Sequence, residues 1–276
     1  MQILMLERRT SPAMVSAVLL GLGVAFAGPA ALAGDATTPE GPSPATPSTA
    51  RLQRLVPDAA IDDPQPTPVN GVYRVRVGSS FVYLSADGEH AFTGDLLDLT
   101  TGENLTEAQR NGNRLAALAG FPSRALLLFP ARGEERARIH VFTDSSCPYC
   151  KKLHGEVPAL QEAGVTIAYI PFPRGGTGSP GDRELRSVWC ADDPAAAFDI
   201  ATGQTTGQAS GALAEASADC ADASAVDTGF RRGASLGVRG TPTIVLLSGA
   251  ALPGYVDVST LLERLRLTQA AGGPYR

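Results

Sequence analysis

The sequence predicts a small antiparallel β unit followed by a larger α/β domain. In residues 72–77, Val72, Arg74 and Arg76 alternate with Tyr73, Val75 and Val77, a period of two, and Asp87-Gly88 is a typical hairpin turn. Further along, strand-like runs at 137–143 and 165–171 flank a segment with helical spacing of apolar residues. A strand, a helix and a parallel strand in this order form a β-α-β unit, so the second part belongs to the α/β class.

Residues 1–33 have the features of a secretory signal peptide. Arg8 and Arg9 supply the positive charge, an uncharged stretch follows from Ala13 to Ala27, and Ala31-Leu32-Ala33 fits a small-x-small cleavage site. The uncharged stretch has about 15 residues, whereas a membrane-spanning helix needs roughly 20. Removal of the segment is therefore favoured over its retention as a membrane anchor, and the rest of the chain is expected to be exported.

Residues 34–67 are predicted to be a disordered segment or linker. They are rich in Pro, Thr, Ala and Ser and have few large apolar side chains, so they offer little surface to bury. Some order could begin within 51–70, but the sequence signal there is weak.

Residues 68–103 are predicted to form a small β-rich domain. Four runs are strand-like, and they are residues 72–77, 81–84, 90–92 and 94–99. A unit of about 40 residues buries too little surface to be comfortably stable alone. We therefore expect it to pair with another copy or with the rest of the chain.

Residues 104–124 are predicted to be a linker helix. Thr106 is a plausible N-cap, and the helix would continue to about Leu118. Gly112 lies in its middle and costs roughly 1 kcal/mol relative to alanine.

Residues 125–270 form the predicted α/β domain. Pro158 is expected to kink its first helix and Gly164 to end it. The Ala- and Asp-rich stretch 182–235 is expected to be a mostly helical insertion. The remaining expected elements are strands at 126–130, 137–143 and 165–171, a helix at 150–163, a hairpin of 243–247 with 251–255, and a closing helix at 258–267.

All four cysteines lie in the part expected to be exported, where disulfides persist. Four cysteines allow three pairings. The two-residue spacing of Cys147 and Cys150 favours a local pair, which leaves Cys190 with Cys220. A bridge across that loop of about 30 residues would stabilise the fold by about 3.5 kcal/mol. A free pair or a redox switch is the alternative for Cys190 and Cys220.

The sequence Cys147-Pro148-Tyr149-Cys150 stands at the start of a predicted helix, directly after an apolar run. Free N–H groups and the positive end of the helix dipole favour an anion there. Lys151 and Lys152 add positive charge one turn on. These features predict a lowered pKa for Cys147, and the thiolate is the form that attacks disulfides. Cys150, one turn deeper in the helix, is suited to release a mixed disulfide.

Three alternatives exist for these cysteines: a plain structural disulfide, half of a zinc site, and a copper site that also uses His154. Zinc would need two further ligands with matching spacing, and Cys190 and Cys220 form no second C-x-x-C. No Met-rich or His-rich tract supports copper. The sequence therefore predicts no metal and no cofactor, and its formal net charge of −5 gives no reason to expect a nucleic-acid partner.

Further expectations concern His154, Asp144, Trp189 and the pair Thr241-Pro242. His154 could influence the charge at the cysteines, but a solvated helix histidine is favoured. Asp144 is expected to cap the helix start, and Trp189 to pack in the core of the insertion. Thr241-Pro242 precedes a predicted strand, where a cis peptide bond is one explanation of the proline; from this spacing alone an ordinary trans turn is favoured.

Several motifs, in the same order, resemble those of the bacterial periplasmic disulfide isomerase family of DsbC and DsbG. The resemblance runs from about Pro68 to Leu265, and its motifs are NGVYRV, VYLSADGEHAFTGDLLDLTTGENLTE, FTDSSCPYCKKLH, IAYIPFPRGG, VWCADDPAAAFD, LGVRGTPTIVL and PGYV. It implies a V-shaped homodimer, in which an α+β N-terminal dimerisation domain and a linker helix precede a thioredoxin-like α/β domain with a helical insertion.

The resemblance also implies roles for residues. Cys147 would attack and Cys150 would resolve, while Thr241-Pro242 would be cis, face the two sulfurs and contact the substrate backbone. A second, non-catalytic disulfide in the insertion would join Cys190 to Cys220. The expected partners are misfolded exported proteins and a DsbD-like membrane reductase that keeps Cys147 and Cys150 reduced.

The expected function is thiol:disulfide interchange in the periplasm, isomerising or reducing non-native disulfides. The Pro-Tyr pair between the cysteines matches DsbG, whereas the best-known isomerase has Gly-Tyr. A DsbG-like chaperone or holdase, a reductase that protects single cysteines, and an oxidase therefore stay open. Thioredoxin has a buried acid six residues before its first cysteine, and here Val141 takes that place.

Overall fold

The computed structural model describes residues 46–205 and 220–267. The predicted signal peptide, residues 34–45 and part of the predicted helical insertion lie outside the described residues. Within them, no helix is both long and apolar enough to cross a membrane.

The N-terminal part is a four-stranded antiparallel sheet in the order β1-β2-β3-β4. Its strands are β1 (Gln65–Pro66), β2 (Val72–Val77), β3 (Ser80–Ser85) and β4 (Ala91–Thr93). Both faces of the β2–β3 pair carry buried side chains, because Tyr73, Val75 and Leu84 turn to one face and Phe81 and Tyr83 turn to the other. The Gly88 N–H donates to the Ser85 carbonyl, which closes the predicted turn between β3 and β4.

Two predictions for this part are wrong. The disordered segment predicted for 34–67 is too long, because α1 (Ala50–Leu55) forms within it and β1 pairs with β2, whereas the sequence leaves order within 51–70 open. Residues 94–99 form no regular strand in the described structure, where Leu97 makes only an isolated bridge to Asn104. The Asp98 carboxylate accepts the N–H groups of Thr100 and Thr101, so the chain reverses where the strand was expected.

The helix α2 (Leu105–Ala119) follows, but Thr106 does not cap it. Asn104 is the N-cap, and its side chain accepts the Glu107 N–H at 2.9 Å. Thr106 is instead fully buried, where its hydroxyl bonds Tyr83 and accepts the Leu96 N–H. At the other end of the helix, Leu118 belongs to the core of the α/β domain.

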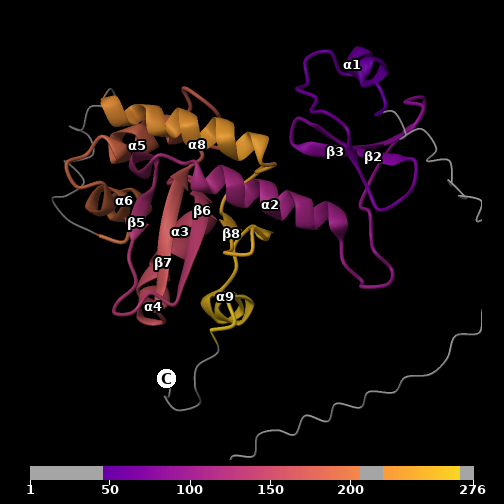
Figure 1. The fold of residues 1–276 in the computed structure, drawn as a ribbon. Coiled ribbons are helices and arrows are strands. Elements are labelled where there is room, and N and C mark those ends of the chain that lie inside the picture. Colours follow the sequence, from indigo (N-terminus) through magenta and orange to yellow (C-terminus); the bar gives the residue numbers. More distant parts are fainter. Residues whose placement is uncertain (1–45, 206–219, 268–276) are drawn as a thin grey trace, which may run out of the picture. The chain divides into compact units, whose positions relative to one another are not determined.

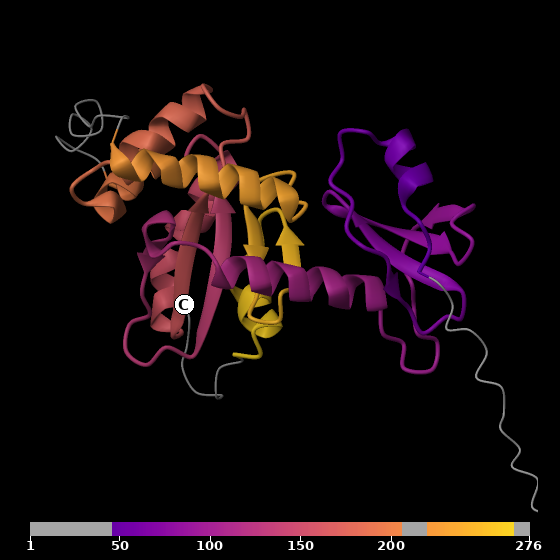
Figure 2. The same cartoon turned by 45° about the horizontal axis from the view of Figure 1, so that its top comes forward.

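The α/β domain is built on a five-stranded sheet in the order β5-β7-β6-β8-β9 (Figures 1 and 2). Only β6 and β7 are parallel. The predicted bounds of these two strands are confirmed. The strands are β5 (Leu127–Phe129), β6 (Ala137–Thr143), β7 (Val165–Pro171), β8 (Thr243–Val245) and β9 (Ala251–Pro253).

Six described α-helices accompany this sheet. The predicted single helix with a kink at Pro158 is wrong, because the chain makes two helices that meet at Glu156 and Pro158 lies in the first turn of the second. The helices are α3 (Pro148–Gly155), α4 (Val157–Glu162), α5 (Pro180–Trp189), α6 (Pro194–Thr202), α8 (Ser224–Ser235) and α9 (Val258–Arg264).

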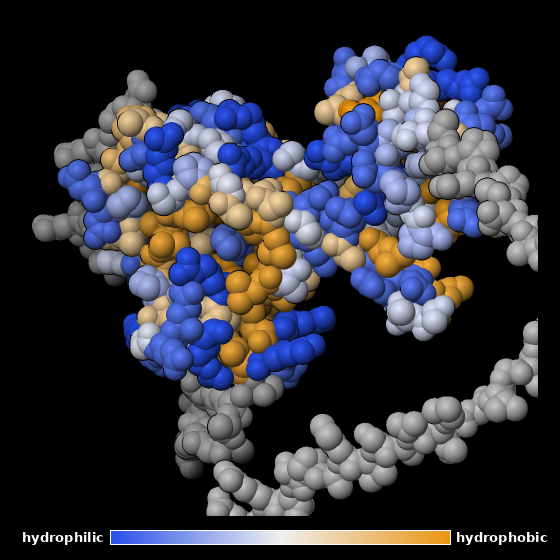
Figure 3. All heavy atoms as spheres, in the orientation of Figure 1, coloured by the Kyte–Doolittle hydropathy of each residue, from blue (hydrophilic) through white to orange (hydrophobic). Residues whose placement is uncertain are grey.

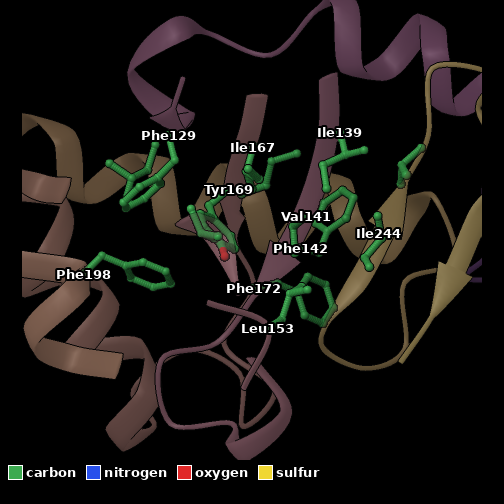
Figure 4. Packing of buried hydrophobic residues seen from close by; sticks show 14 of the residues in the cluster. Phe129, Ile139, Val141, Phe142, Leu153, Ile167, Tyr169, Phe172, Phe198 and Ile244 are labelled. Atoms are coloured by element: carbon green, nitrogen blue, oxygen red, sulfur yellow. The ribbon is translucent and has the colours of Figure 1, made fainter. Parts of the chain in front are cut away.

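The core of the domain lies on both sides of β6 and β7. Every residue of β7 is buried, as expected for a central strand covered on both faces. Figure 4 shows Phe129, Tyr169 and Phe198 together on the α6 side, and Phe142 with Phe172 in another part of the core. Close packing on both faces therefore fixes the end of β6, and Cys147 follows in the loop after this strand.

Two glycines test this packing. A Cβ at Gly229 would lie 2.2 Å from the Pro171 carbonyl oxygen, because α8 lies directly on β7 there. A Cβ at Gly112, on the exposed side of α2, would meet nothing within 4 Å.

We therefore expect Gly229→Ala to lower the free energy of unfolding by about 1–3 kcal/mol through overpacking. Gly112→Ala is expected to raise it by about 0.5–1 kcal/mol through helix propensity. Urea unfolding of both variants measures the difference, and equal shifts in the same direction would contradict the described packing.

Candidate active site

The loop between β6 and α3 is held by Asp144. Its buried carboxylate accepts the N–H and the hydroxyl of Ser146, and also the N–H of Arg174 from the chain beyond β7. The prediction that Asp144 caps the helix is therefore wrong, since its oxygens hold the turn before the helix. The N-cap position is Cys147 itself, and no side chain caps α3.

Cys147 thus stands where the first N–H groups of α3 are free of helix partners. Only 1% of the residue is exposed, and its Sγ lies 3.3 Å from the carbonyl oxygen of Thr241. Burial alone would raise the pKa of Cys147. The N–H groups of Cys150 and Tyr149 and the side chains of Thr241 and Cys150 outweigh it, so the pKa lies below its ordinary value.

Cys150 lies one turn further into α3 and has the opposite character. Burial, together with a negative charge on Cys147, raises the pKa of Cys150 to about 11. The backbone at Asp144 and the side chains of Thr241 and Thr143 act against this rise. Both cysteines are free thiols in this structure, so one thiol ionises readily and the other holds its proton.

The peptide bond between Thr241 and Pro242 is cis, and it lies just before β8. The Gly254 N–H beside β9 donates to the Pro242 carbonyl at 2.8 Å, which anchors this segment next to the sheet. The structure therefore brings Thr241, from a position 94 residues beyond Cys147, into contact with its sulfur.

Two buried hydroxyls face the same thiols. Thr143 ends β6 and Thr241 precedes Pro242, and among the described residues neither hydroxyl oxygen has a hydrogen-bond partner of ordinary geometry. Both side chains lower the pKa of Cys150, so both lie close enough to interact with its sulfur. Sequence reasoning missed Thr143; its place at the end of the strand before the cysteines was the only available signal.

Tyr149 marks the solvent side of the site, with 61% of its surface exposed. Its ring stacks on Tyr255 with centroids 6.4 Å apart, and Lys152 places its Nζ 4.2 Å from the centre of the Tyr255 ring. The Tyr255 hydroxyl donates to Glu156 at 2.5 Å. Tyr255 was also missed, because it comes from beyond β9.

His154 is almost fully buried, with 2% of the side chain exposed, so the prediction of a solvated helix histidine is wrong. Leu153 and Val157 of the same helix region are buried with it, because this side of α3 turns inward. Both ring nitrogens of His154 are engaged, one by Tyr169 and one by Asp199. Neither nitrogen is free to join Cys147 and Cys150 as a copper ligand.

Among residues 46–205 and 220–267, no three His, Cys, Asp or Glu side chains cluster in a way that could hold a metal ion. Cys190 and Cys220 form a disulfide in this structure. It joins the C-terminal end of α5 to the residue before the short helix Ala221–Ala223. The bridge closes the part of the chain that was expected to be a helical insertion.

Comparison with known proteins places these features in a family. Residues 124–269 match a thioredoxin-like domain, and residues 30–107 match the disulfide bond isomerase protein N-terminal domain. The thiol:disulfide interchange protein DsbC of Escherichia coli K12 is 35% identical over 206 residues, which cover 74% of this chain and 80% of the relative. The chain belongs to the DsbC family.

Two further DsbC proteins are similar over comparable lengths. The protein of Salmonella typhimurium is 33% identical, covering 69% of this chain and 75% of the relative. That of Dickeya dadantii is 30% identical, covering 75% and 82%. Both domains of the DsbC family are thus present, and the thioredoxin-like domain carries the two free thiols at the start of its α3 helix. The chain is a thiol–disulfide oxidoreductase of this family.

The opposite pKa shifts of the two thiols predict separate titrations. In a Cys150→Ser variant the thiol that remains is Cys147, and its ultraviolet thiolate absorbance is expected to rise at a pH below that of free cysteine. In a Cys147→Ser variant the absorbance is expected to rise only at a pH above that of free cysteine, because burial still raises the pKa of Cys150.

As the pH falls through the lowered pKa of Cys147, its thiolate is lost, which is the form of a cysteine that can attack a disulfide. Coincident titration curves for the two variants would contradict the described site.

Proposed function

We propose that this protein isomerises or reduces non-native disulfides of exported proteins in the periplasm. The observation that carries the proposal is the pairing of Cys147, whose pKa is lowered, with the protonated thiol of Cys150 beside the cis Thr241-Pro242 segment. A stable thiolate with a latent second thiol suits reversible attack on a disulfide.

The chemistry begins with the Cys147 thiolate. Its sulfur attacks one sulfur of a substrate disulfide, the S–S bond of the substrate breaks, and the other substrate sulfur leaves as a thiolate. A mixed disulfide now joins Cys147 to the substrate. The Thr241-Pro242 segment borders Cys147, and this supports a role for its backbone in contacting the substrate chain next to the attacked sulfur.

The mixed disulfide can be resolved in two ways, here called the isomerising exit and the reductive exit. If another substrate thiolate attacks, a rearranged substrate disulfide forms and Cys147 is released, so the substrate is isomerised with no net electron transfer. If Cys150 attacks, a Cys147–Cys150 disulfide forms and the substrate gains two electrons. The second exit requires reduction of this protein afterwards, which we assign to a DsbD-like membrane reductase.

The same proposal includes export and assembly. The features of residues 1–33 support secretion to the periplasm. The match to the isomerase N-terminal domain supports a homodimer built on that domain. In that part of the chain β4 is an edge strand, and Phe92, Leu97 and Leu99 are exposed, with 91% of Leu99 accessible. Figure 3 shows hydrophobic residues at the surface of the loop between β4 and α2.

The test compares two variants in two assays. Cys147→Ala is expected to abolish refolding of scrambled ribonuclease while leaving suppression of aggregation of a disulfide-free client unchanged. Cys150→Ala is expected to keep the attack and to accumulate covalent adducts with substrate, because the intramolecular exit is closed.

The outcome of the same assays separates the alternatives. Full ribonuclease refolding by the Cys147→Ala variant would overturn the proposal. If the unaltered protein suppresses aggregation and does not reshuffle disulfides, the holdase function is the correct one. Rapid acid quench and thiol labelling in cells should find Cys147 and Cys150 mostly reduced, whereas a resting disulfide would indicate an oxidase.

A further inference from the structure

A buried chain of polar groups begins on the same inward side of α3 as Cys150, because residues four positions apart on a helix are neighbours and Cys150 and His154 are both buried. His154 follows Cys150 by four residues, one turn along α3. Its Nδ1 lies 3.1 Å from the Tyr169 hydroxyl of β7, and its Nε2 lies 2.8 Å from Asp199 Oδ1 of α6. The Asp199 side chain is 38% exposed, so the chain runs from the interior to solvent.

The surroundings of His154 are aromatic. The rings of Phe129 and Phe198 lie edge-on to the imidazole, with centroids at 4.9 and 4.7 Å, and Trp189 packs on Phe198. Figure 4 shows Phe129, Tyr169 and Phe198 converging in this part of the core. An ionisable side chain in such a place is unfavourable unless every polar atom has a partner, and both nitrogens of His154 have one.

The two hydrogen bonds fit a neutral imidazole. The Tyr169 hydroxyl donates to Nδ1, and the Nε2–H donates to the Asp199 carboxylate. Burial lowers the pKa of His154, against the opposing effect of Asp199. Burial, together with the charges of Cys150 and Asp199, raises the pKa of Tyr169 well above its ordinary value, so it stays a phenol.

Cys150 needs a proton acceptor when it attacks the mixed disulfide, since its thiol holds its proton to about pH 11. On β6, Val141 is fully buried and apolar, and the Asp144 carboxylate is already bound to Ser146 and Arg174. The charge of Cys147 acts on Cys150, and the charge of Cys150 in turn acts on Tyr169 of β7. Among the described residues, His154 interacts with Asp199 from α6 and with Tyr169 from β7. The neighbour that β5 contributes is the apolar ring of Phe129.

We propose that Tyr169, His154 and Asp199 carry away the proton of Cys150 when Cys150 resolves the mixed disulfide. This inference rests on the proposed function and specifies its reductive exit. Tyr169 takes up the thiol proton while its own hydroxyl proton passes to Nδ1 of His154, and Asp199 stabilises the imidazolium that results.

The Cys150 sulfur then bonds to the Cys147 sulfur, and the bond between Cys147 and the substrate breaks. The substrate leaves as a thiolate, and the imidazolium gives its extra proton to solvent at the Asp199 end. The Cys147 and Cys150 pair is oxidised by two electrons and the substrate disulfide is reduced by two. His154 and Asp199 are positioning residues here, because they act through Tyr169.

The test separates the two steps with an aromatic disulfide whose thiolate is coloured. Stopped-flow mixing of the reduced protein with this reagent gives one phase whose rate depends on reagent concentration, the attack by Cys147. A second phase, independent of concentration, is the attack by Cys150. Both phases release one coloured thiolate and can be followed as a function of pH.

His154→Gln is the sharpest variant, because a glutamine amide can keep both hydrogen bonds and cannot accept a proton. Tyr169→Phe removes one oxygen and keeps the ring. Each is expected to slow the second phase near neutral pH by about 100-fold, the lower end of what a positioned acid–base group contributes. Asp199→Asn is expected to slow it less, and in all three the pH profile of this phase shifts upward while the first phase stays unchanged.

Phe198→Leu is the matched control, since it alters the same aromatic shell without touching a polar atom of the chain. It should leave the pH profile of the second phase in place. The inference is overturned if His154→Gln and Tyr169→Phe resolve with the rate and pH profile of the unaltered protein. It is also overturned if Phe198→Leu produces the same shift. Loss of the first phase in the unaltered protein would instead refute the proposed function.

Discussion

The site depends on where α3 begins. The helix starts at Cys147, so the sulfur faces backbone N–H groups that no helix carbonyl can satisfy. A thiolate accepts those hydrogen bonds better than a thiol does, which is why the pKa of Cys147 falls although the residue is buried. The start of α3 is fixed in turn by Asp144, whose carboxylate binds the turn before the helix to the chain beyond β7. The reactivity of one atom is thus tied to the packing of the central sheet.

The same helix gives its two cysteines opposite properties. Cys150 lies one turn deeper in the helix. Burial raises its pKa by more than the neighbouring hydrogen-bonding groups lower it, so the pKa rises to about 11. A thiol that seldom ionises leaves the mixed disulfide time to exchange with other thiols of the substrate, which favours isomerisation over reduction. Proton transfer through Tyr169, His154 and Asp199 would then set the rate at which Cys150 attacks the mixed disulfide and releases the reduced substrate. Two thiols of equal acidity would not separate these outcomes.

Much of the fold could be predicted from local patterns, and the rest depends on contacts between distant residues. The bounds of β6 and β7 follow from runs rich in β-branched and aromatic residues, and Asp87-Gly88 correctly marks a turn. Thr106 looked like a helix cap because its chemistry fits one, but Tyr83 draws it into the interior and Asn104 takes its place. The sequence placed Cys147 at a helix start, whereas no local pattern brings Thr241 to its sulfur. The burial of His154 was missed because Tyr169 and Asp199 come from other elements.

The acidity of Cys147 relative to Cys150 is the claim on which this account rests. The most direct measurement is the pH dependence of alkylation of the fully reduced, unaltered protein by iodoacetamide, with each labelled cysteine assigned by peptide mass spectrometry. The account predicts that Cys147 alone is labelled near neutral pH, with a midpoint below that of free cysteine. Labelling of Cys150 at the same rate, or of Cys147 no faster than free cysteine at neutral pH, would contradict it.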